Sequence, residues 1–152
     1  MRVGIAGYGL AGRSFHGALL KSCGFEVSAI LTTNATRARQ AKEDFPTVTI
    51  VESMDALLGC ELNLIVIATT NDVHASLAIA AMRAGVPVVV DKPFSRNLNE
   101  THEVLKASNE SSVPVIKKSK STENTSDKRI KSSLGKKGNK FAIKDKDDEN
   151  VV

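Results

Sequence analysis

Short apolar segments alternate with segments of helical character along most of the chain, and this alternation constrains the fold more than any other feature. The expected strands are residues 2–6, 26–31, 47–51, 62–68, 86–90 and 113–116. Segments 62–68 and 86–90 are almost entirely apolar, which is typical of strands that are covered on both faces of a sheet. Such strands, separated by helices, predict a doubly wound α/β fold, in which a parallel sheet carries helices on both faces and the crossovers are right-handed.

The segments between the strands carry the signals expected of helices. Phe15, Leu19 and Leu20 are spaced to share one face of a helix that follows the first glycine cluster. Gly85 is placed to end a later helix, and Pro114 suits a strand start or an edge strand because it has no backbone N–H. Helix caps are expected at Asn34, Ser53, Asp72 and Asn97.

Charge is distributed unevenly along the 152 residues. Residues 1–116 are close to neutral, and the excess that gives the chain its net charge of +4 lies in residues 117–152. That segment is rich in Lys, Ser, Asn and Gly and has few large apolar side chains, so it cannot bury enough surface to offset the entropy of ordering it. We therefore predict one folded domain over residues 1–116 and a disordered basic tail over residues 117–152.

The two cysteines, Cys23 and Cys60, have no metal-ligand spacing and are typical of reduced thiols in a cytoplasmic protein. No apolar run approaches the roughly 20 residues of a membrane span, and the first residues lack the pattern of a signal peptide. We expect a cytoplasmic protein with no membrane partner and no metal site.

A glycine motif follows the first expected strand. Gly7, Gly9 and Gly12 match G-x-G-x-x-G between a strand and a helix, which is the context that gives this short motif its meaning. Gly7 permits the tight turn, Gly9 lets a pyrophosphate approach the backbone amides, and Gly12 lets the helix pack closely on the strand. Leu10 and Ala11 lie inside the motif and are expected in the same site. A dinucleotide site is therefore favoured over a glycine-rich turn without a ligand.

The end of the second strand bears on the choice between NAD and NADP. Thr32, Thr33 and Asn34 stand where an Asp or Glu would bind the adenosine 2′-hydroxyl of NAD and repel the 2′-phosphate of NADP. Arg37 and Arg39 follow one turn later. The pattern favours NADP, with NAD as the alternative. For each arginine taken singly, a solvated position on the helix carries equal weight.

Two further motifs carry a resemblance to a known family. Residues 69–74 (T-T-N-D-V-H) follow the fourth strand, and residues 91–93 (D-K-P) follow the fifth. Together with the glycine loop they resemble the glucose-fructose oxidoreductase / inositol dehydrogenase / MocA (Gfo/Idh/MocA) family, whose members usually show T-P-N-x-x-H and E-K-P at these places. The resemblance covers about residues 1–116, and Thr70 and Asp91 replace the usual Pro and Glu.

The resemblance implies roles for the loop after the fourth strand. Thr69, Asn71 and His74 would contact the ribose and nicotinamide half of the cofactor. For His74, a helix-face or core-edge position carries equal weight. For His16, on the first helix, a structural role is preferred.

The resemblance also places Lys92 beside the nicotinamide and the substrate, as the catalytic residue. A cationic lysine can polarise the oxygen of the reacting carbon and stabilise negative charge that develops there during hydride transfer. Asp91 and Pro93 flank Lys92 and are expected in the cofactor site, and in the family this proline often follows a cis bond. The alternative for Lys92 is a solvated loop lysine.

The function that the resemblance implies is hydride transfer between a nicotinamide cofactor and a sugar or polyol. Family members continue into a second domain that holds the substrate pocket, and nothing in residues 117–152 resembles it. We therefore expect a truncated form with weak or no activity alone, which would meet a sugar or polyol only if a second domain is supplied. The alternative is a stand-alone nucleotide-binding or sensory module without catalysis. Nucleic-acid binding through the basic tail is ranked last, since Phe141 is its one aromatic residue.

Overall fold

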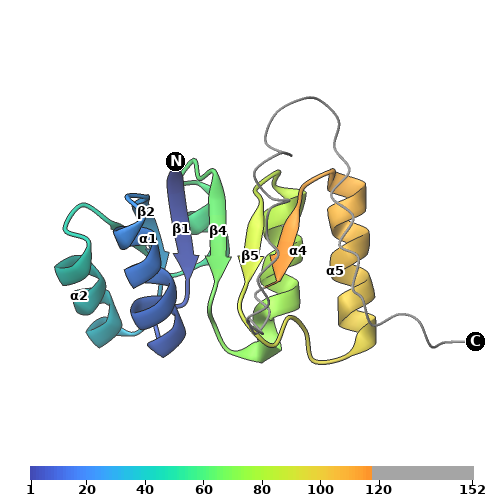
Figure 1. Cartoon of the computed structure of the whole chain (residues 1–152), viewed down its shortest axis with the longest axis horizontal. Helices are drawn as coiled ribbons and strands as arrows, with labels where there is room; N and C mark the ends of the chain where they lie inside the picture. Colours follow the sequence, from blue (N-terminus) through green and yellow to red (C-terminus); the bar gives the residue numbers. More distant parts are fainter. Residues whose placement is uncertain (118–152) are drawn as a thin grey trace, which may run out of the picture. The chain divides into compact units, whose positions relative to one another are not determined.

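The computed structural model describes residues 1–117, and these contain a six-stranded parallel sheet. Its strands are β1 (Arg2–Ala6), β2 (Glu26–Leu31), β3 (Thr49–Val51), β4 (Leu64–Ile67), β5 (Val88–Val90) and β6 (Val115–Lys117). They lie in the order β3-β2-β1-β4-β5-β6, with all neighbours parallel, and the arrows of β1, β4 and β5 point the same way in Figure 1. The predicted tail lies outside the described residues, apart from residue 117.

Helical segments connect the strands. They are the π-helix η1 (Ala11–Gly17), α1 (Ala18–Ser22), α2 (Ala35–Asp44), α3 (Met54–Leu58), the 3-10 helix η2 (Asn71–Val73), α4 (His74–Arg83) and α5 (Leu98–Ser111). Strand and helix alternate as predicted. No helix within residues 1–117 has the length and apolar character needed to cross a membrane.

Two apolar clusters pack against the sheet, one on each face. The first joins Ile65, Ile67 and Val88 of the sheet to α3, α4 and α5 through Leu57, Met82 and Val104 among others. The second joins Val3, Ile5 and Ile30 to α1 and α2 through Leu20 and Ala41. Neighbouring residues of one strand face opposite sides, so a sheet with two covered faces needs strands that are apolar throughout. The doubly wound α/β class is therefore confirmed.

Three of the four expected helix caps are present. The side chains of Asn34, Ser53 and Asn97 accept hydrogen bonds from the backbone N–H three residues on, at 3.0, 3.2 and 3.0 Å. The cap at Asp72 is wrong: Asp72 lies inside η2, and α4 begins at His74 without a side-chain cap. The chain already turns there, because the N–H of Val73 donates to the carbonyl of Thr70.

The face that the first helical segment turns to the sheet differs from the predicted one. Phe15 and Leu19 are 55% and 60% exposed, and of the predicted set only Leu20 is buried. The buried positions of η1 and α1 are Gly12, His16, Gly17 and Leu20. Small residues let this segment approach β1 and β4 closely, and a count of large apolar side chains does not detect such a face.

Candidate functional site

A groove of about 370 Å³ lies where β1, β2 and β4 end. It is lined by Gly7, Gly9, Leu10, Ala11, Leu31, Thr32, Thr33, Arg37, Ala68, Thr69, Thr70 and Val73. The chain runs outward from β1 through β2 to β3 and then returns to β4 on the other side of β1. Ligands of open α/β sheets bind at this reversal, outside the carboxyl ends of the strands.

The glycine loop and the loop after β4 touch through their backbones. Gly7 has a φ of 91°, and a β-carbon on it would lie 2.7 Å from the carbonyl oxygen of Ala68 and 2.9 Å from the Cα of Thr69. A β-carbon on Gly12 would collide with the carbonyl oxygen of Gly7. Only glycine fits at both positions, so the loop closes tightly and the helical segment packs directly on it.

Arg37 of α2 reaches over the same loop. Its guanidinium carbon lies 3.8 Å from the point where a β-carbon on Gly9 would stand. The absence of a side chain at Gly9 leaves the backbone open to the groove, and Leu10 beside it is 75% exposed. Backbone amides and a guanidinium that face one groove are a suitable arrangement for phosphate groups.

The three residues after β2 have different surroundings. Thr32 is buried, its N–H donates to the carbonyl of Val51 at 2.9 Å, and its hydroxyl accepts from the N–H of Asn34 at 3.3 Å. Thr33 is exposed and lines the groove. Asn34 uses its side-chain oxygen to cap α2, and neither it nor Arg39 is among the described residues that line the groove.

His74 lies behind the groove. It is 1% exposed, and its ring nitrogens face two backbone carbonyls: Nδ1 lies 2.8 Å from the oxygen of Pro93, and Nε2 lies 3.1 Å from that of Thr69. Thr69 itself lines the groove, whereas Asn71 is exposed in η2 outside the lining. His74 therefore lies between the loop after β4 and the segment after β5, and its ring contacts one backbone carbonyl of each.

The segment Asp91–Pro93 follows β5 at the same edge of the sheet. Lys92 is exposed, and the peptide bond between Lys92 and Pro93 is cis. Asp91 is 8% exposed, and its carboxylate lies 3.4 Å from Nε2 of His16. None of these three residues is among those that line the groove within residues 1–117. Pro93 is connected to the groove through His74, whose ring contacts the carbonyl of Pro93 and the carbonyl of Thr69, a residue of the lining.

Four residues of the lining were not predicted: Leu31, Ala68, Thr70 and Val73. Leu31 ends β2, Ala68 and Thr70 follow the end of β4, and Val73 ends η2. For the first three, the position at the carboxyl end of a strand is the signal that could have identified them. In residues 1–117 no group of acidic, His and Cys side chains has the arrangement of a metal site.

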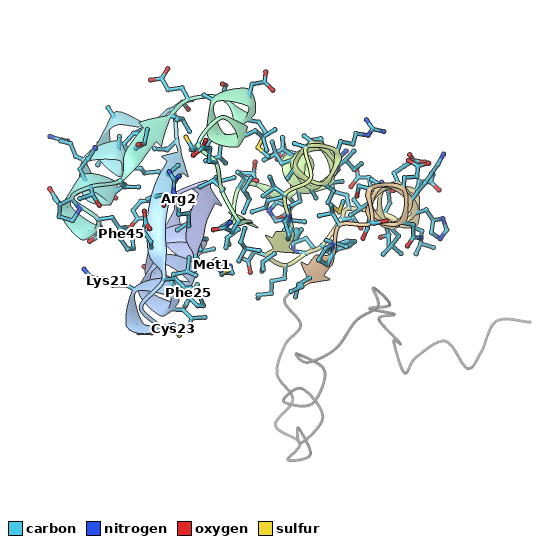
Figure 2. All side chains as sticks on the ribbon, turned by 90° about the horizontal axis from the view of Figure 1, so that it is seen from above. Met1, Arg2, Lys21, Cys23, Phe25 and Phe45 are labelled. Carbon is cyan, nitrogen blue, oxygen red and sulfur yellow. The ribbon has the colours of Figure 1, made fainter. Side chains whose placement is uncertain are left out.

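Tyr8, Arg13 and Asp44 form a polar cluster that links the glycine loop and η1 to the end of α2. Arg13 donates to both carboxylate oxygens of Asp44, at 2.6 and 3.2 Å, and the hydroxyl of Tyr8 donates to the same carboxylate at 2.9 Å. The hydrogen bond from Arg13 lowers the pKa of Asp44, while burial and the bond to Asp44 raise the pKa of Tyr8 above its usual range. Lys21 of α1 lies beside Phe45, with Nζ 5.7 Å from the ring centroid (Figure 2).

Comparisons with known proteins agree with this geometry. A family described as "Oxidoreductase family, NAD-binding Rossmann fold" (GFO_IDH_MocA) matches residues 1–118. The uncharacterized oxidoreductase YdgJ of Escherichia coli (strain K12) is 42% identical over 106 residues, which cover 68% of this chain and 30% of YdgJ. The scyllo-inositol 2-dehydrogenase (NADP(+)) IolW of Bacillus subtilis (strain 168) is 31% identical over 115 residues, or 74% of this chain and 31% of IolW.

A solved structure has a similar fold. The NAD-binding protein from Listeria innocua superposes with a TM-score of 0.69 at 29% identity, over 76% of this chain and 34% of that protein. The chain thus spans about a third of the length of these relatives. The glycine loop, the groove and the family match over residues 1–118 lead to one conclusion: the chain belongs to the Gfo/Idh/MocA family of oxidoreductases and carries its NAD-binding Rossmann domain.

Proposed function

We propose that this chain binds NADP(H) in the groove and provides the cofactor-binding part of an oxidoreductase that transfers hydride to or from a sugar or polyol. One observation carries the proposal: the glycine loop, the end of β2 and the loop after β4 line a single groove at the reversal of the sheet. The open backbone at Gly9 fits a pyrophosphate, and a side chain there would fill that space.

The end of β2 supports NADP over NAD. No acidic residue is among the described residues that line the groove, and Thr33 and Arg37 offer a hydroxyl and a guanidinium at the start of α2. A guanidinium forms charge-assisted hydrogen bonds to phosphate, and a carboxylate would repel it. The relative IolW, 31% identical to this chain, is named as an NADP(+) enzyme.

Lys92 is the proposed catalytic residue. When bound, the cofactor accepts or delivers a hydride at its nicotinamide ring. The exposed ammonium of Lys92 would donate a hydrogen bond to the oxygen of the reacting carbon and stabilise negative charge as it develops there. A polyol is proposed as substrate because IolW acts on scyllo-inositol according to its name.

Turnover is proposed to need more than these 152 residues, since the matched segment covers only 30% of YdgJ and 31% of IolW. On their own, the 152 residues are expected to bind the cofactor with little or no turnover. We also propose a cytoplasmic location, because Cys23 and Cys60 are both free thiols.

The test is a fluorescence titration of the full chain with NADPH and with NADH. We expect NADPH to bind about tenfold more tightly, the difference made by a single charge-assisted contact. Equal or reversed affinity would contradict the choice of NADP, and no binding of either nucleotide would contradict the proposed function. Turnover of the 152 residues alone is then measured with a panel of polyols and sugars, where little or none is expected. Clear turnover that is lost in Lys92→Met would contradict the need for more than these 152 residues and would support the role proposed for Lys92.

A further inference from the structure

Two buried histidines flank the segment that carries Lys92. His16 is 6% exposed and His74 is 1% exposed. His16 belongs to η1, directly after the glycine loop, and His74 begins α4, directly after the loop that follows β4. Each histidine thus comes from an element that starts at the groove, and each faces a different neighbour of Lys92.

The contact at Pro93 links two loops through one ring. Nδ1 of His74 lies 2.8 Å from the carbonyl oxygen of Pro93, and Nε2 lies 3.1 Å from that of Thr69. A neutral imidazole donates through one nitrogen and a doubly protonated ring donates through both. In either form the ring lies between the two loops and donates a hydrogen bond to at least one of the two carbonyls.

A second contact, between Asp91 and His16, involves the residue on the other side of Lys92. The carboxylate of Asp91 lies 3.4 Å from Nε2 of His16, and the side chains are 11% and 8% exposed. The backbone of Asp91 is held as well, because its N–H donates to the carbonyl of Ile67 in β4 at 2.9 Å. A buried carboxylate is costly away from donors and positive charge, so the nearby imidazole favours the position that Asp91 has in this structure.

We propose that His16 and His74 are positioning residues, which together hold the backbone on both sides of Lys92 and fix it relative to the glycine loop and the loop after β4. Lys92 is exposed, so its own side chain supplies little restraint, and its placement depends on Asp91 and Pro93. The significance for catalysis rests on the proposed function, but the two backbone restraints do not. The nicotinamide end of a bound cofactor should depend on both histidines, and the adenosine end should not.

The first test measures the free protein. ¹⁵N relaxation of the amides of Lys92 and Phe94 is recorded in the full chain for the wild type, His74→Gln and His16→Gln. The control is His102→Gln, since His102 is an exposed histidine on α5. We expect rigid amides in the wild type and the control, and increased mobility around Lys92 in each of the other two variants. Folded variants with amides as rigid as the wild type would overturn the proposal.

A wild-type measurement covers the case in which His74→Gln does not fold. Burial of the ring and its hydrogen bond to a carbonyl slow exchange of the ring N–H, so the proton on His74 should be visible at neutral pH while those of the exposed His102 exchange too fast to observe. A His74 ring proton that exchanges as fast as those of His102 would overturn the proposal.

The second test measures the cofactor end. NADPH is compared with 2′-phospho-ADP-ribose, which lacks the nicotinamide ring. Both variants should bind NADPH about fivefold more weakly, which corresponds to one hydrogen bond, and should bind 2′-phospho-ADP-ribose as the wild type does. Equal losses for both ligands would indicate a general structural role and overturn the proposal. A wild type that binds neither ligand would contradict the proposed function, and the amide mobilities would still decide the role of the two histidines.

Discussion

The guanidinium carbon of Arg37 lies 3.8 Å from the point where a β-carbon on Gly9 would stand. Arg37 belongs to the first turn of α2, which follows β2, whereas Gly9 belongs to the loop after β1. The contact therefore joins the region proposed for the adenosine 2′-phosphate to the region proposed for the pyrophosphate. The planar guanidinium of arginine matches the geometry of phosphate oxygens, so a positively charged group suited to phosphate lies beside the loop.

Removing this charge should change cofactor choice more than overall binding. Arg37→Ala is expected to weaken NADPH binding about 10- to 100-fold, the range for hydrogen bonds to charged groups. NADH binding should weaken less, because NADH has only its pyrophosphate near this charge. Titration of both nucleotides measures the two affinities. Arg39→Ala is the matched control, because Arg39 lies on the same helix and is not among the residues lining the groove. Equal weakening of NADPH and NADH by Arg37→Ala would contradict the prediction.

Gly9→Ala should separate binding from folding. A β-carbon at position 9 meets only the Arg37 guanidinium, at 3.8 Å and beyond, which is an ordinary contact. The melting temperature should therefore stay close to that of the wild type, while affinity for either dinucleotide falls because the methyl group occupies the approach to the backbone amides. Thermal unfolding with and without NADPH gives both quantities. A variant that keeps its affinity would show that no phosphate approaches residue 9.

Gly12→Ala should instead destabilise the fold. Its β-carbon would collide with the carbonyl oxygen of Gly7, a backbone atom that cannot move without shifting the loop. We expect a loss of about 1–3 kcal/mol in the free energy of unfolding, as for overpacked cores, measured by urea denaturation. Gly59→Ala is the control: the nearest atom to its β-carbon would be the carbonyl oxygen of Ala56 at 3.5 Å. A Gly12→Ala protein as stable as the control would contradict the packing described here.

Asp44 should make the fold sensitive to acid. The hydrogen bond from Arg13 is the largest cause that lowers its pKa in the folded protein below its usual value of 3.8. A carboxylate with a lowered folded pKa contributes stability above its unfolded pKa, and this contribution is lost as the pH falls through the folded pKa. The melting temperature of the wild type should therefore decrease as the pH is lowered below about 4. Asp44→Asn should make the melting temperature less dependent on pH in this range.

The control for Asp44 is Glu52→Gln, which removes an exposed carboxylate outside the cluster of Tyr8, Arg13 and Asp44. It is expected to retain the acid dependence of the wild type. Melting curves between pH 3 and pH 7 in steps distinguish the variants. If Asp44→Asn is as acid-sensitive as the wild type, the cluster does not account for the pH dependence.

Most of the fold followed from the sequence because the sheet is covered on both faces. Strands such as β4 and β5 are then apolar throughout, and capping residues such as Asn34 and Asn97 mark the helix starts. The buried face of η1 did not follow, since Gly12, His16 and Gly17 form it, while the large apolar side chains of Phe15 and of Leu19 in α1 are exposed. Apolar periodicity indicates a helix but cannot identify a face made by close backbone approach.

The sequence motifs predicted which loops form the site, but they did not predict the side-chain contacts between those loops. The motifs locate the glycine loop, the end of β2 and the loop after β4, and residues of all three line the groove. The position of His74 between Thr69 and Pro93 depends on contacts between segments far apart in sequence. The contact of Asp91 with His16 likewise depends on β5 lying beside β4 and on the close packing of η1. A single sequence contains no signal for such pairs.

Gly7 lies so close to the loop after β4 that a β-carbon on Gly7 would stand within 3 Å of three backbone atoms of Ala68 and Thr69. The loops after β1 and β4 therefore pack as one unit through their backbones. An insertion in one loop would shift the backbone of the other. The end of β2 is joined to this unit by the hydrogen bond from the N–H of Gly7 to the carbonyl of Leu31 at 2.9 Å. Arg37 of α2 adds a side chain beside Gly9, and that side chain can be exchanged without moving a backbone. The proposed cofactor preference can therefore change by substitution of Arg37, whereas the loops proposed for the pyrophosphate and for the nicotinamide half are constrained to change together.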